Sequence, residues 1–321
     1  MIILRFISCL LPAMLAAHLA TAQTFPSKPV RIVVPFGAGG VADLTARTVA
    51  QKLSESLGQP VVVDNKPGAG GVVAGDAVAK AEPDGHTLLL MSNGTAVSAS
   101  LFKSLPFDTL RDFAPVSTLG FFDIAIITPA DSKFKTLAEL LTFAKANPGK
   151  LNLGSINIGS TQNLAAELFK TSSGADLQIV PFNGTPAVIT ALRGGQIDAA
   201  VEILGPILPQ IKANALRALA VTGDKRAAVL PDVPSAKESG LPTFVASSWN
   251  ALAAPAKTPK DVIARLNRDV AAALNAPDVK KKLYDLNVEA RPSSPEQAAE
   301  LLAGEIRRWG EVITRAKIPT Q

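Results

Sequence analysis

The chain has 321 residues, enough for two lobes that each bury a core of their own, and aromatic side chains make up only 5% of it. Its formal net charge of +5 is spread along the sequence, which argues against a nucleic-acid-binding protein and suits an anionic solute. The one cysteine, Cys9, lies near the start, so a chain that lost this segment would have no disulfide, thiolate nucleophile or cysteine metal site.

Residues 1–22 are typical of a secretory signal peptide. Arg5 precedes an apolar stretch, and residues 20–22 read Ala-Thr-Ala, an A-x-A cleavage site before Gln23. The apolar stretch is too short to span a membrane. We therefore expect a mature protein in the periplasm that keeps a single histidine, His86, which excludes a multi-histidine metal site.

A strand that opens through glycines into a helix follows the signal peptide. The β-formers from Val30 to Val34 lead through Phe36 into the small residues 37–40 and then into a helical pattern. A helix that starts in this way leaves several backbone N–H groups unpaired at the positive end of its dipole. Glycine has no Cβ atom, so an anion can approach these groups closely. The segment therefore predicts an anion-binding loop.

The same segment also matches a dinucleotide fingerprint. Residues 37–42 fit G-x-G-x-x-A after a strand, and Asp64 follows a second apolar run at 61–63. Three interpretations stay open at this point: a dinucleotide site, a small-anion loop, and a purely structural strand-to-helix turn.

The alternation of strand and helix continues along the first part of the chain. Strands are expected at 60–64 and 87–91, with a helix at 72–81 between them. This order predicts a parallel sheet with right-handed crossovers, in which ligands lie at the carboxyl ends of the strands. The loops 36–40 and 92–95 should therefore share one rim of the sheet.

A second α/β unit follows an apolar strand at 122–128. Thr136 and Glu139 form a capping box at the start of a helix, and Thr185 is expected to cap another helix whose first residue is Pro186. Strands in this unit are expected at 151–155, 178–182, 197–203 and 216–222.

The last part of the chain is helical, after a strand-like run at 249–254. Trp309 falls on the apolar face of the final helix, and we expect this part to pack on the first unit. The chain would then cross twice between two lobes and form a hinge there. The expected division is lobe 1 from residues 23–124 and 250–321, and lobe 2 from residues 125–249.

A series of motifs in fixed order carries a family resemblance. They are PSKPVRIVVPFGAGGVAD, VVVDNKPGAGG, PDGHTLLL, ANPGKLNLGS, IGSTQNLAAELF, VPFNGTPA, LRALAVTGDKR and LPDVPSAKESG. Together they run from about Phe25 to the C-terminus, and the chain resembles the extracytoplasmic solute receptors of tripartite tricarboxylate transporters, the Bug family. The resemblance implies an α/β, two-lobe periplasmic binding protein fold (type II, Venus-flytrap) with a mainly parallel sheet in each lobe. It also implies a small carboxylate as the ligand and the membrane subunits of a tripartite transporter as partners.

The resemblance also points to a binding site. In this family the loop that matches 36–43 holds one carboxylate through backbone amides and ordered waters, and the loops that match 155–163 and 182–186 supply the facing lobe. The helix starts in these three loops would point into one cleft and hold a carboxylate without a buried cation. The expected ligand-binding residues are Phe36, Ala38, Gly39, Gly40, Asp43, Ser92, Asn93, Ser155, Gly159, Ser160, Thr161, Asn163, Phe182, Asn183, Gly184, Thr185 and Glu202.

Several of these residues have a second interpretation. Asp43 would position a bridging water in the family, but a carboxylate in the first turn of a helix is also favourable as a dipole partner. Phe36 and Phe182 are expected as apolar walls of the cleft or as core residues. Asn163 and Glu202 stand where the family often has histidine and aspartate. Asn163 would tune specificity or face solvent, and Glu202 would repel a carboxylate unless it recognised a ligand ammonium or hydroxyl group.

The leading hypothesis is a monomeric, non-enzymatic binding protein that needs no metal or cofactor and presents an organic acid to a permease. The alternative from another class is an exported serine hydrolase. However, neither Ser155 nor Ser160 lies in a G-x-S-x-G motif, and His86 should lie in a different lobe. A solute-sensing receptor that feeds no permease fits the sequence equally well. A dinucleotide is disfavoured, because an exported protein meets no cytoplasmic supply of it.

Overall fold

The computed structural model describes residues 25–315 and 318–320. The predicted signal peptide at 1–22 therefore lies outside the described residues. Within the described part of the chain, none of the helices combines the length and the apolar character that a membrane crossing requires.

Strands and helices alternate through most of the chain. The strands are β1 (Val30–Val34), β2 (Val61–Asn65), β3 (Thr87–Ser92), β4 (Phe113–Pro129), β5 (Asn152–Ile156), β6 (Gln178–Phe182), β7 (Ala199–Ile203), β8 (Leu216–Val221), β9 (Ser247–Pro255) and β10 (Val288–Ala290). The helices are α1 (Val41–Leu57), α2 (Val72–Ala79), α3 (Asn93–Leu101), α4 (Leu137–Ala146), α5 (Thr161–Ser173), α6 (Thr185–Arg193), α7 (Leu204–Lys212), α8 (Lys260–Asn275), α9 (Pro277–Asp285) and α10 (Pro295–Arg315), with a short 3-10 turn η1 (Ala69–Gly71).

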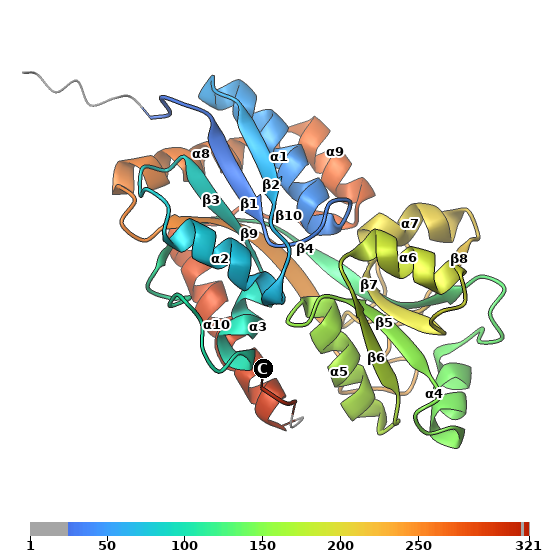
Figure 1. Cartoon of the computed structure of the whole chain (residues 1–321). Helices are drawn as coiled ribbons and strands as arrows, with labels where there is room; N and C mark the ends of the chain where they lie inside the picture. Colours follow the sequence, from blue (N-terminus) through green and yellow to red (C-terminus); the bar gives the residue numbers. More distant parts are fainter. Residues whose placement is uncertain (1–24, 316–317, 321) are drawn as a thin grey trace, which may run out of the picture.

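The main path of the sheet has the order β2-β1-β3-β9-β4-β7-β5-β6, and β8 and β10 both pair with β4 (Figure 1). The pairs of β1 with β2 and β3, and of β5 with β6 and β7, are parallel, as the sequence predicted. The pairs that involve β4 and β9 are antiparallel. We call the body that contains β1–β3, α1–α3 and α8–α10 lobe 1, and the body that contains β5–β8 and α4–α7 lobe 2. The predicted two-lobe α/β fold is confirmed.

The long strand β4 belongs to both lobes. Its first part, Phe113–Asp123, pairs with β9, whereas Ile124–Pro129 pairs with β7 and β8. The sequence predicted a strand at 122–128 only, whereas β4 already begins at Phe113. The strand tolerates Pro115 because the register with β9 shifts between Pro115 and Ser117, where a ladder hydrogen bond is not required.

Helices cover both faces of each lobe (Figure 1). In lobe 1, α1, α8 and α9 bury their apolar faces against one side of the sheet, and α2, α3 and α10 cover the other side. In lobe 2, α4 and α5 share one core, and α6 and α7 share another. The predicted packing of the C-terminal helix on the first unit is confirmed, because Trp309 of α10 is fully buried in the core that contains α3.

One predicted helix cap is wrong. The N-cap of α6 is Gly184, and Thr185 is already the first helical residue, with Pro186 following it. The hydroxyl of Thr185 is therefore not used to cap its own helix, and it donates a hydrogen bond to Glu202 instead.

Candidate functional site

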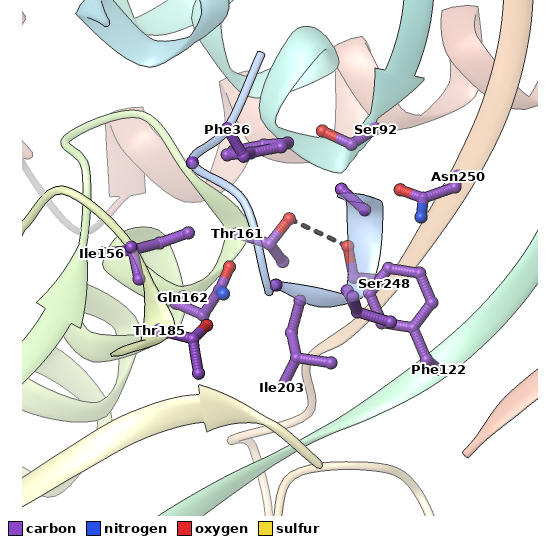
Figure 2. Close-up of a pocket in the computed structure, with 15 residues that line it drawn as sticks. Phe36, Ser92, Phe122, Ile156, Thr161, Gln162, Thr185, Ile203, Ser248 and Asn250 are labelled. Atoms are coloured by element: carbon purple, nitrogen blue, oxygen red, sulfur yellow. Dashed lines mark hydrogen bonds between the residues drawn. The ribbon is translucent and has the colours of Figure 1, made fainter. Parts of the chain in front are cut away.

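A cavity lies between the two lobes where several loops and both crossing strands meet (Figure 2). It encloses about 380 Å³ of empty space, part of which is open to solvent. It is lined by Phe36, Gly37, Gly40, Val41, Ala42, Ser92, Phe122, Ile156, Thr161, Gln162, Gly184, Thr185, Ile203, Ser248 and Asn250. None of these side chains is charged, so an anion in the cavity would have to be held by dipoles and hydrogen-bond donors.

Five helices begin at the cavity wall. The sequence predicted the starts of α1, α5 and α6 at one cleft, and the structure adds the starts of α3 and α7. The N-caps of α1 and α6 are glycines, and no side chain caps either helix. In α1 the first N–H groups are therefore not satisfied by a cap. In α6 this applies to the N–H of Thr185, because Pro186 has no N–H and Ala187 N donates to the carbonyl oxygen of Gly184. The positive ends of the two helix dipoles face the same space from opposite lobes.

The crossing strand β9 contributes two polar residues that the sequence analysis missed. Ser248 Oγ lies 3.0 Å from Thr161 Oγ1, a hydrogen bond that joins β9 to the start of α5 (Figure 2). Asn250 is fully buried, and neither its Oδ1 nor its Nδ2 atom has a hydrogen-bond partner in the protein. A buried amide without partners is unfavourable, so Asn250 is suited to bind a polar ligand group in the cavity.

Glu202 lies directly behind the cavity wall rather than in it. Its Oε2 atom accepts hydrogen bonds from Thr185 Oγ1 at 3.0 Å, from Ile203 N at 3.2 Å and from Gln162 Nε2 at 3.4 Å. Its Oε1 atom is buried and has no partner. Burial raises the pKa of Glu202 to about 7, although the three hydrogen bonds act in the opposite direction.

Asp43 and Gly39 are hydrogen-bonded to each other. The N–H group of Gly39 donates to Asp43 Oδ2 at 3.0 Å, so this amide is already paired and is not presented to a ligand. Asp43 is buried outside the cavity lining, and its Oδ1 atom accepts a hydrogen bond from Arg47 Nε at 3.0 Å. Arg47 also donates to Asn65, which in turn donates to the carbonyl oxygen of Phe36. These contacts brace the loop that presents the start of α1.

The hydrogen bonds from Arg47 and Gly39 also change the pKa of Asp43. Burial alone would raise the pKa of Asp43, but the hydrogen bonds from Arg47 and Gly39 outweigh it and hold the pKa below its ordinary value of 3.8. A lowered pKa in the folded state means that the carboxylate stabilises the fold above about pH 4, and that this contribution is lost as the pH falls through the folded-state pKa.

Replacing Asp43 by alanine should therefore lower the free energy of unfolding by about 1–3 kcal/mol at neutral pH, because the Gly39 amide loses its acceptor and Arg47 its partner. Denaturant unfolding at neutral pH and at about pH 3 measures this effect, and the difference from wild type should shrink at the lower pH. The variant Asp43→Asn is the matched control, since its amide oxygen can still accept from Gly39. Equal unfolding curves for wild type and Asp43→Ala at neutral pH would contradict the proposed brace.

Four of the expected ligand residues are joined to one another by hydrogen bonds: Ser155, Gly159, Ser160 and Asn163. Asn163 accepts from the N–H group of Gly159 and donates to Ser155 Oγ, and its backbone N–H donates to Ser160 Oγ. Asn163 is only 6% exposed, so the interpretation that it faces solvent is wrong. None of the four lines the cavity, and together they shape the turn that leads into α5.

Asn93 is also directed away from the cavity. Its Oδ1 atom accepts a hydrogen bond from Trp309 Nε1 at 2.8 Å, and its Nδ2 atom donates to the carbonyl oxygen of Ser247 at 3.1 Å. Ser92, the preceding residue, lines the cavity and caps α3 with a capping box. Ala38, Phe182 and Asn183 complete the expected residues that do not line the cavity.

The lobes touch through glycine backbone at several places, two of which lie in the loops expected to bind the ligand. A Cβ atom on Gly37 would lie 2.9 Å from the carbonyl oxygen of Asn183 in the opposite lobe. A Cβ atom on Gly159 would lie 3.0 Å from the Cα atom of Gly70. Real Cβ atoms essentially never approach other atoms as closely as 2.9 Å, so a side chain on Gly37 would keep the lobes apart. A side chain on Gly159 would make a tight contact and require its neighbour to shift by a few tenths of an ångström.

The hydrolase alternative finds no support in these contacts. Ser155 and Ser160 pair with Asn163 and with backbone groups. His86, the one histidine among the described residues, accepts the Ser27 N–H at Nε2 and packs against the ring of Phe25. The described residues also hold no cluster of three or more His, Cys, Asp or Glu side chains of the kind that binds a metal ion.

Comparisons with known proteins agree on one family. A family model described as the tripartite tricarboxylate transporter family receptor, TctC, matches residues 45–318. The protein BugT of Bordetella pertussis is 38% identical over 302 residues, which cover 93% of each chain.

Several solved structures are similar to this chain over most of its length. The periplasmic binding protein BugD has a TM-score of 0.89 at 32% identity, over 92% of this chain and 100% of that one. The R. palustris protein Rpa4515 with adipate has a TM-score of 0.88 at 32% identity, over 92% and 99% of the two chains. MatC from Rhodopseudomonas palustris with bound malate has a TM-score of 0.86 at 34% identity, over 90% and 100%.

Proposed function

Because this chain belongs to the tripartite tricarboxylate transporter receptor family, we propose that it is a periplasmic solute-binding protein that captures a small carboxylate between its lobes. We further propose that it delivers this carboxylate to the membrane subunits of a tripartite transporter. Two relatives whose structures contain malate and adipate support a carboxylate as the ligand.

The observation that carries the proposal is the uncharged cavity between two uncapped helix starts. The starts of α1 and α6 face the cavity from opposite lobes, and no side chain caps them. Backbone N–H groups and helix dipoles bind anions without a cation, so one carboxylate can satisfy donors from both lobes at once. Thr161 and Asn250 line the same space and would supply further hydrogen bonds.

Binding by this site would proceed as a shift between open and closed states. The ligand contacts both lobes only when the cleft is closed, so it stabilises the closed state by the difference in these contacts. We propose that the hinge lies in β4 and β9, and that lobe 1 comprises residues 23–124 and 250–321 and lobe 2 residues 125–249. The change of partner along β4, between Asp123 and Ile124, supports this division.

A thermal-shift panel tests the proposal. Malate, adipate, citrate and aspartate, each in large excess, should include at least one ligand that raises the melting temperature by several degrees. A ligand at about a hundred times its Kd stabilises the folded state by about 2.7 kcal/mol through mass action. The neutral diamides of malate and adipate are the controls and should cause no shift. The proposal fails if a broad panel of mono-, di- and tricarboxylates leaves the melting temperature unchanged.

A further inference from the structure

Glu202 is an ionisable group whose contacts all lead to the cavity wall. It lies near the end of β7 and has no exposed surface. Its three hydrogen-bond donors are Thr185, Gln162 and Ile203, and each of these residues lines the cavity. The charge of Glu202 is therefore separated from a bound ligand by one layer of side chains.

No cation balances this carboxylate among the described residues. The elements packed against β7 are β4, β5, α5, α6 and α7. Their charged side chains are partly or fully exposed, and none of them makes a hydrogen bond or ion pair with Glu202; they are Asp123, Glu167, Lys170, Arg193 and Lys212. A negative charge at Glu202 is therefore offset by no neighbouring side-chain cation and is held by the hydrogen bonds to Oε2.

The two carboxylate oxygens of Glu202 differ in their hydrogen-bond partners. Oε2 has three donors, and Oε1 is buried without any partner. An ionised Glu202 leaves Oε1 as an acceptor without a donor, and a protonated Glu202 with its proton on Oε1 leaves a hydroxyl without an acceptor. A neutral unpaired group costs less to bury than a charged one. Burial raises the pKa of Glu202 to about 7, so both forms are accessible near neutral pH.

A ligand with two negative charges would shift the equilibrium between ionised and protonated Glu202. The uncapped helix starts of α1 and α6 favour one carboxylate, but a second carboxylate in the same small cavity would lie close to Glu202. Two like charges in a poorly solvated site repel each other, and the lower free energy is reached when one of them takes up a proton from solvent.

Resting on the proposed function, we propose that Glu202 is a proton-linked specificity residue, which binds a proton when a dicarboxylate fills the cavity. In its ionised form it would instead favour a ligand whose second polar group is a hydrogen-bond donor or a cation. Glu202 is thus a positioning residue that acts on the ligand through Thr185 and Gln162.

Isothermal titration calorimetry with malate and with adipate tests this inference. The Kd of wild type should weaken roughly twentyfold between about pH 6.5 and about pH 8.5, since binding then requires a proton that the free protein no longer carries. At about pH 7.5 the observed heat should differ between two buffers with different ionisation enthalpies. Glu202→Gln, which is neutral at every pH and nearly identical in shape, should bind both probes with the same Kd across this range.

The possible outcomes distinguish a failure of the role of Glu202 from a failure of the proposed carboxylate-binding function. Equal Kd values for wild type at the two pH values, with no dependence on the buffer, would overturn the role of Glu202 and leave the binding function intact. A pH dependence that persists in Glu202→Gln would also overturn it, because another group would then take up the proton. If Glu202→Gln does not fold, the buffer dependence of wild type decides alone. Absence of binding by any carboxylate at any pH would reject the proposed function, and this inference with it.

Discussion

Gly37→Val should weaken carboxylate binding by roughly a hundredfold or more while leaving the ligand-free protein folded. The φ angle of Gly37 lies outside the left-handed region, so a side chain is compatible with the backbone. The obstacle is on the other lobe, where a Cβ atom would lie 2.9 Å from the carbonyl oxygen of Asn183. The lobes would stop short of contact, and the ligand would lose the helix starts of one lobe. A hundredfold change in Kd corresponds to about 2.7 kcal/mol.

Ala38→Val is the matched control for this experiment. Ala38 lies in the same loop, but it is exposed and does not line the cavity. We expect its Kd to stay within a few-fold of wild type. Calorimetry gives the affinities, and the melting temperatures without ligand show that both variants fold. Equal affinities of Gly37→Val and Ala38→Val would show that contact between these loops is not needed for binding.

Asn250→Leu should change stability and ligand affinity in opposite directions. Both polar atoms of Asn250 are buried without a partner, which destabilises the ligand-free protein by about 1–3 kcal/mol. Leucine has a similar size and no polar atoms, so the ligand-free variant should be more stable. The ligand, however, loses a donor to its carboxylate. A hydrogen bond to a charged group contributes about 1.5–3 kcal/mol, so the Kd should rise by roughly ten- to a hundredfold.

The control for Asn250→Leu is Thr128→Val on β4. The hydroxyl of Thr128 is also fully buried without a partner, but Thr128 does not line the cavity. Its replacement by valine should raise stability and leave ligand affinity unchanged. Denaturant unfolding without ligand and calorimetry with ligand measure the two effects. A less stable Asn250→Leu variant with wild-type affinity would rule out a ligand-binding role for this amide.

The fold could be predicted from sequence largely because its units are local. Each strand, small turn and helix is contiguous, and the rule that parallel strands end at one rim placed the loops after β1 and β3 together. The long strand β4 was not predicted in full, because Pro115 breaks the alternation that reveals a strand. Its pairing on one side with β9 and on the other with β7 depends on contacts between distant parts of the chain.

The candidate site was less predictable than the fold. The pattern identified the helix starts, but it could not tell which amides are already paired, and the Gly39 amide is used by Asp43 within its own loop. Asn250 lies beside Ser92 only because β9 runs antiparallel to β3 in one particular register. A shift by one residue would turn Asn250 to the opposite face of the sheet, and no local pattern fixes that register.

The contact between Gly37 and Asn183 bears on which ligands the protein can enclose. Main chain of one lobe meets main chain of the other there, and a Cβ atom on Gly37 would lie 2.9 Å from the carbonyl oxygen of Asn183. The distance between the lobes at this point is therefore set by the backbone and not by the rotamer of a side chain. Because packed interiors yield little to strain, a ligand too large for the space would hold these two residues apart. The receptor would then reject a larger acid by failing to close on it.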